Sequence, residues 1–151
     1  YASAFSLDNV NFVSGICAEG TWTPILQDAT GNQFTHSTQL GRYTRFGNMV
    51  TVFIGLIWSA KGSAVGTSAI RLAGLPYASN ATYGGCGITS GIAGNPGFTY
   101  AAGEMYTTLS PALNAVYFNL WRQRSGAADY FLVVNNIGAS GTLYATVSYP
   151  I

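Results

Sequence analysis

Five carboxylates are the residues with which this sequence could carry out acid–base chemistry. Glycoside hydrolysis needs two carboxyl groups that lie about 5 to 10 Å apart. The five acids are scattered along the chain and no two share a predicted strand, so we expect solvated acids in turns. Glu104 and Asp129 are the pair that neighbouring strands could still bring together. The acids are Asp8, Glu19, Asp28, Glu104 and Asp129.

His36 is the one histidine of the chain, and it stands in the polar run Thr35-His36-Ser37-Thr38, which predicts a loop. A Ser–His–acid arrangement forms in space rather than in sequence, so it stays an open alternative. Ser90, however, does not stand in the nucleophile motif G-x-S-x-G. One histidine and two cysteines without a Cys-x-x-Cys spacing do not make a zinc site. We therefore expect no catalytic residue, no metal and no cofactor in this stretch of chain.

Aromatic side chains give the strongest signal for binding. Tyr117, Asn119 and Trp121 alternate along one predicted strand and therefore share a face. Flat rings stack on the C–H faces of sugars, while amide, guanidinium and carboxylate groups bind the hydroxyls. The same residue types are enriched at protein interfaces, and we favour that interpretation over a carbohydrate site. The candidates for either role are Tyr117, Asn119, Trp121, Arg122, Arg124, Asp129 and Tyr130, with Tyr77, Tyr83, Tyr100 and Tyr106 as secondary candidates.

Alternation with a period of two predicts that these residues lie on strands. The run Val50–Trp58 is apolar at both odd and even positions, so we expect a strand covered on both sides. In the next such run, Val116, Phe118 and Leu120 are expected to point into the core.

Turn signals rich in glycine, asparagine and proline recur about every ten residues. Gly47-Asn48 stands between two strand-like runs and predicts a tight hairpin. Short strands at this spacing predict an all-β fold, an antiparallel β-sandwich of the jelly-roll type.

The first stretch of the chain differs from the rest. Phe5–Val13 alternates apolar and small polar residues like one rung of a β-helix, which needs neighbouring rungs to bury its face. An N-terminal edge strand is the alternative interpretation. We divide the chain into residues 1–19, the end of an upstream β-helix or a linker strand, and residues 20–151, the sandwich.

Charge is sparse: 7% of the residues are charged, 48% are hydrophobic, and the net charge is +1. Six basic residues cannot form a patch that binds nucleic acid, and the longest apolar run is too short to insert in a membrane. Such a surface must be neutral and polar or be buried against other subunits. Cys17 and Cys86 are compatible with a disulfide and equally with two free thiols.

Four segments share their order and spacing with a known family. They are Gly20–Pro24 (GTWTP), Gly41–Val50 (GRYTRFGNMV), Ile70–Tyr77 (IRLAGLPY) and the closing run Ser140–Tyr149. Together they resemble the C-terminal β-sandwich domain of tailspike and tail-fibre proteins of tailed bacteriophages. The resemblance covers residues 20–151, although the middle of that range, residues 80–103, matches no motif.

The resemblance implies a non-enzymatic homotrimer at the distal end of a spike, behind a β-helix. It implies a place in the tail of the virion after synthesis in the host cytoplasm, with host cell-surface polysaccharide as a partner. Depolymerase sites in this family usually lie on the preceding β-helix, so any such activity would belong to an upstream domain. Two alternatives stay open: a monomeric carbohydrate-binding module, and a carbohydrate esterase or glycosidase domain.

Overall fold

The computed structural model describes residues 17–80, 104–112, 114–124 and 130–151, and structural statements below refer to these residues. This part of the chain consists of strands joined by turns and loops, with one short 3-10 helix. The elements are β1 (Cys17–Trp22), β2 (Ile25–Asp28), β3 (Thr35–Phe46), β4 (Met49–Ala60), β5 (Ile70–Ala73), β6 (Glu104–Pro111), β7 (Tyr117–Arg124), β8 (Tyr130–Phe131), η1 (Val134–Asn136) and β9 (Gly141–Pro150).

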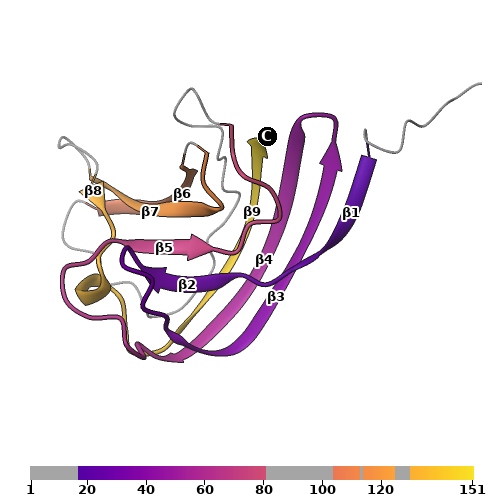
Figure 1. Ribbon diagram of the computed structural model, residues 1–151. Helices are drawn as coiled ribbons and strands as arrows, with labels where there is room; N and C mark the ends of the chain where they lie inside the picture. The colour runs from indigo at the N-terminus through magenta and orange to yellow at the C-terminus, as the bar shows by residue number, and fades with distance from the viewer. Residues whose placement is uncertain (1–16, 81–103, 113, 125–129) are drawn as a thin grey trace, which may run out of the picture.

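The strands form two antiparallel sheets that pack face to face. One sheet has the order β1-β3-β4-β9, and the other has the order β2-β5-β7-β6 with β8 paired to β7. The strands of the two sheets cross rather than run alongside each other (Figure 1). The predicted all-β sandwich is therefore confirmed. Residues 1–16, including the predicted β-helix rung, lie outside the described residues, and β1 begins three residues before the predicted boundary at Gly20.

The core forms where the inner faces of the two sheets meet. The even-numbered residues of β4 from Val50 to Trp58 are at most 5% exposed, as the alternation of this strand predicts. Phe118 of β7 and Tyr149 of β9 are both fully buried, and their rings meet edge to face with centroids 5.4 Å apart. This contact joins the two layers of the sandwich.

The odd-numbered residues of β4 correct one expectation. Phe53 is 45% exposed, because the second sheet packs against only one face of β4 and no layer of the described chain covers the other. Val116 corrects another, since it is 49% exposed rather than in the core. It lies in the bend before β7 begins, so the alternation of that strand does not extend back to it.

The predicted hairpin is confirmed. β3 and β4 pair up to Phe46 and Met49, and Gly47-Asn48 forms the two-residue turn between them. Gly47 has a φ of +57°, which glycine adopts without strain. The Nε–H of Arg45 donates a 2.8 Å hydrogen bond to the carbonyl oxygen of Gly47 and closes the turn.

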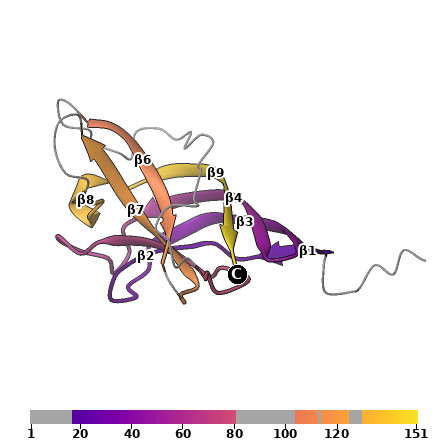
Figure 2. The ribbon, with the colours of Figure 1, turned by 90° about the horizontal axis from the view of Figure 1, so that it is seen from above.

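The hairpin end of β3 and β4 extends past the second sheet and lies beside the start of β1 (Figures 1 and 2). The segment after β5 covers the inner face there. Tyr77 packs edge to face on Tyr43 with centroids 5.6 Å apart, and its ring lies 5.2 Å from the guanidinium carbon of Arg45. The hydroxyl of Tyr149 donates a hydrogen bond to the carbonyl oxygen of Tyr77. No helix among the described residues is long and apolar enough to cross a membrane.

Candidate functional site

Asp28 is a buried structural carboxylate, which corrects the prediction of a solvated turn acid. Its side chain is 1% exposed and accepts hydrogen bonds from the backbone N–H and the side chain of both Thr30 and Asn32. Burial alone raises the pKa of a carboxyl group, but these four hydrogen bonds outweigh it and lower the pKa of Asp28 to about 2. A carboxylate held in this way orders its loop and is poorly suited to act as a general acid.

His36 lies in β3 rather than in the predicted loop, at an irregularity of the pairing with β4. Its Nε2 accepts a 3.0 Å hydrogen bond from the backbone N–H of Leu26 in the other sheet. Partial burial lowers the pKa of His36 below its usual 6.5. The side chain therefore connects β2 to β3, and the ring nitrogen that would accept a proton already has a donor.

The remaining acids and cysteines are not brought together in the described residues. Glu19 is exposed on β1, and Cys17 is exposed at the start of the same strand. Asp129 and Cys86 lie outside the described residues, so an approach of Asp129 to Glu104 and a Cys17–Cys86 disulfide both stay open alternatives. Within the part of the chain that the structure describes, no three His, Cys, Asp or Glu side chains gather to hold a metal ion.

Tyr117, Asn119 and Trp121 share the outer face of the β2-β5-β7-β6 sheet, as their alternation predicts. They are half-buried, whereas Phe118 and Leu120 between them are fully buried. Residues from two further strands join them. These five residues, called the aromatic ledge from here on, are Arg71, Tyr117, Asn119, Trp121 and Phe131.

Two stacked pairs give the aromatic ledge its shape. The guanidinium carbon of Arg71 lies 4.4 Å from the ring centroid of Tyr117, and a hydrogen bond to the carbonyl oxygen of Ala29 holds one of its nitrogens. The rings of Trp121 and Phe131 are tilted by 30° with centroids 4.0 Å apart. Asn119 pairs across the strands with Arg71. The ledge thus offers flat rings, an amide and a fixed guanidinium on one surface.

The other candidates do not all join the aromatic ledge. Tyr77 packs on Tyr43 and supports the hairpin end of the first sheet instead. The remaining candidates lie on strands whose side chains at these positions are not described, or outside the described residues altogether. The former are Arg122, Arg124, Tyr130 and Tyr106; the latter are Asp129, Tyr83 and Tyr100.

The outer face of the β1-β3-β4-β9 sheet is apolar and open. Five of the eight exposed large hydrophobic side chains of the described residues lie on it, with exposures between 43% and 72%. A polar row, Thr44, Thr51 and Ser148, separates Phe46 and Met49 at the hairpin end from Leu40, Phe53 and Tyr144. Clusters of exposed large hydrophobic side chains such as these mark interaction surfaces. We call this surface the apolar face; its large side chains are Leu40, Phe46, Met49, Phe53 and Tyr144.

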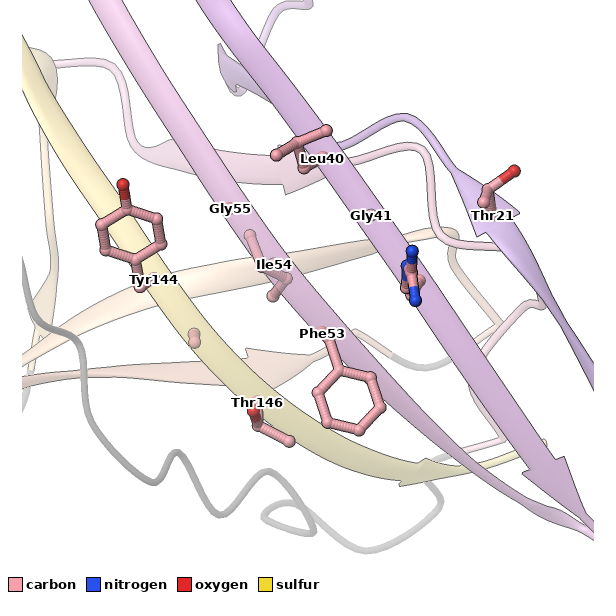
Figure 3. A pocket seen from close by; sticks show the side chains of 10 residues that line it. Thr21, Leu40, Gly41, Phe53, Ile54, Gly55, Tyr144 and Thr146 are labelled. Carbon is pink, nitrogen blue, oxygen red and sulfur yellow. The ribbon is translucent and has the colours of Figure 1, made fainter.

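A depression of about 570 Å³ lies at the centre of the apolar face. Gly55 pairs with Leu40 on one side and with Tyr144 on the other, so the middle strand contributes no side chain between them. Figure 3 shows Leu40, Phe53 and Tyr144 standing on three neighbouring strands around Gly55. The lining residues are Thr21, Leu40, Gly41, Arg42, Phe53, Ile54, Gly55, Tyr144, Ala145 and Thr146.

The apolar face could not be assembled from the sequence alone. The side of β4 that carries Phe53 was expected to be covered, but nothing in the sequence places Leu40 and Tyr144 beside it. Those two residues are 104 positions apart in sequence, and only the fold fixes the register that brings their strands to either side of β4. The apolar residues Phe53 and Ile57 at odd positions of β4 were the one signal in the sequence.

Comparisons with known proteins support the fold. No family model matches this chain, and no curated protein sequence matches it. Among solved structures, the Dettilon tailspike protein (gp208) matches with a TM-score of 0.59 and 20% sequence identity. The match covers 87% of this chain and 23% of the tailspike chain, so this chain spans about a quarter of that protein's length. The sandwich described here therefore has the same fold as one part of a phage tailspike protein.

Proposed function

We propose that this chain is a non-enzymatic association domain of a phage tailspike or tail fibre, that it forms a homotrimer, and that it belongs to the virion tail. The observation that carries the proposal is the apolar face. A sheet face with five exposed large hydrophobic side chains loses unfavourable contact with water when another subunit covers it. The fold shared with part of a tailspike protein supports the same assignment.

Binding also fits the described residues better than catalysis does. Asp28 is saturated with hydrogen bonds, and Nε2 of His36 is occupied by the amide of Leu26. Glu19 is exposed on β1, whereas Asp28 lies in β2 of the other sheet and His36 is directed toward that same strand. None of these groups is poised beside a second acid or base within the described part of the chain, which an esterase or glycosidase requires.

Polar substitutions on the apolar face test the association. Phe53→Asn and Leu40→Asn remove apolar area from the centre of the face without touching the core, because both side chains are exposed. We expect each variant to stay folded but to give a lower molar mass than the wild type in light scattering, because its subunits dissociate. Val65→Asn is the matched control, since Val65 is 68% exposed on a loop away from this face. The same molar mass for the wild type and all three variants would contradict the proposal.

The aromatic ledge supports a second part of the proposal, recognition of host-surface polysaccharide. It lies on the outer face of the opposite sheet, so association through the apolar face leaves it accessible. Stacked rings beside an amide and a guanidinium are suited to the C–H faces and hydroxyls of a neutral sugar. This placement favours the sugar over the subunit as the occupant of the ledge.

Two aromatic substitutions separate the two roles. Trp121→Ala is expected to abolish binding to host-surface polysaccharide and to leave the trimer intact. Tyr144→Ala, on the apolar face, is expected to weaken the trimer instead. Loss of the trimer in Trp121→Ala would assign the ledge to the subunit interface, and unchanged polysaccharide binding would remove the sugar from the proposal.

A further inference from the structure

Among the described residues, the apolar face carries one acidic and one basic side chain, Glu19 on β1 and Arg42 on β3. In the register of these strands Glu19 pairs with Thr44, and Arg42 pairs with Thr21. The two therefore lie diagonally across neighbouring strands on the same side of the sheet. Both line a hollow of about 410 Å³ that opens beside Phe53.

Both charges are unpaired within the described part of the chain. Glu19 and Arg42 are exposed, and neither side chain makes a hydrogen bond or an ion pair with a described residue. The contrast with Arg45 is informative, because that guanidinium is bound to the turn at Gly47 and stacked on Tyr77. The free side chains lie beside the central depression, where Arg42 forms part of the wall.

Covering the apolar face would remove these two charges from water. A buried charge without a partner is costly, whereas a buried pair with good geometry offsets that cost. Each further copy of the same face brings one acid and one base, so neighbouring copies together can satisfy both charges. This complementarity selects a copy of this chain as the occupant of the face.

We propose that Arg42 of one copy forms an ion pair with Glu19 of the next copy across the subunit interface. The inference rests on the proposed association and adds a contact that fixes how neighbouring copies are aligned. In a ring of three copies, each subunit uses Arg42 toward one neighbour and Glu19 toward the other, which gives three equivalent pairs. Arginine suits this position because its guanidinium binds a carboxylate through two parallel hydrogen bonds.

Charge exchange tests the pair. Arg42→Glu and Glu19→Arg each place like charges together in the interface, and we expect the dissociation concentration to rise about tenfold or more in each. Mixing the two single variants sets Arg42 of the Glu19→Arg variant against Glu19 of the Arg42→Glu variant. We expect the mixture to associate more tightly than either variant alone, which an ion pair within one chain would not produce. Circular dichroism and thermal unfolding serve as the fold control, since both side chains are exposed.

The outcomes separate this inference from the proposed function. If the wild type is trimeric and the single exchanges associate as tightly as it does, the ion pair is refuted while the association stands. If both single variants are weakened and their mixture associates no more tightly than either alone, the two charges do not meet across the interface and the pair is also refuted. If the wild type itself is monomeric, the proposed function fails and the ion pair fails with it.

Discussion

Gly141 lies directly opposite Trp58 across β4 and β9, and the indole ring fills the space that a side chain at position 141 would need. Trp58 is 1% exposed, and its indole N–H donates a 3.2 Å hydrogen bond to the carbonyl oxygen of Gly138. The indole ring is therefore buried, anchored by this hydrogen bond and packed directly on the backbone of Gly141. A glycine at position 141 is therefore a requirement of the core.

The first prediction is that Gly141→Ala destabilises the domain by about 1 to 3 kcal/mol, the usual cost of overpacking a core. Denaturant unfolding measures the loss. Gly55→Ala is the matched control, because a β-carbon there would meet its nearest neighbour, in Leu40, at an ordinary 3.5 Å. We expect the control to change stability by less than about 0.5 kcal/mol. Equal stability of the two variants would contradict the packing described for Trp58.

The second prediction concerns the β3–β4 hairpin. Gly47→Val is expected to cost about 1 to 3 kcal/mol, because a branched residue is strained at the positive φ of Gly47. Space is not the reason, since nothing lies within 4 Å of a β-carbon at this position. Asn48→Val is expected to cost less, because Asn48 is not among the described residues with positive φ. Melting temperatures that fall equally in both variants would refute the backbone argument.

The third prediction concerns acid stability through Asp28. Its pKa is about 2 in the folded protein and near 3.8 in the unfolded chain, so the folded state favours the charged form. The resulting stability is complete above pH 3.8 and is lost as the pH falls toward 2. Asp28→Asn should therefore be less stable than the wild type at pH 6, and the difference should shrink at pH 2. A constant difference over this range, measured by urea unfolding, would contradict the hydrogen-bonded carboxylate.

The fourth prediction concerns His36. Burial lowers its pKa in the folded state below the unfolded value of 6.5, so the neutral ring is favoured by folding. The stability from this group is complete above pH 6.5 and declines as the pH falls below that value. His36→Gln removes the titration and keeps an oxygen that can accept the N–H of Leu26. As the pH is lowered from 7 to 5, we expect the free energy of unfolding of the variant to rise relative to that of the wild type. An unchanged ratio of the two over this range, measured by urea unfolding, would refute the role given to His36.

Much of the architecture could be predicted from alternation and turn chemistry. The buried face of β4 from Val50 to Trp58 and the turn at Gly47-Asn48 both follow from local sequence, because a strand period and a two-residue turn are local properties. The outward direction of Tyr117 and Trp121 followed from the same period. The same period wrongly placed Val116 in the core, because the alternation of side chains starts only at Tyr117, where β7 begins.

The rest depends on contacts that strand alternation and two-residue turns do not encode. Asp28 was expected in solvent because isolated acids usually are, yet Thr30 and Asn32 supply enough donors to bury it. The spacing Asp28, Thr30, Asn32 is the local signal that could have indicated a carboxylate-centred turn. The apolar face had no local signal of this kind, because Leu40 and Tyr144 become neighbours only through β4.

The molar mass of the chain in solution tests the central claim most directly. Light scattering during size-exclusion chromatography at micromolar concentration is predicted to give three times the 15.9 kDa of one chain. The physical reason is that the apolar face is exposed in a single copy and must be covered. A molar mass of 15.9 kDa under these conditions would contradict the account, because it would show that the apolar face is stable in water without a second copy.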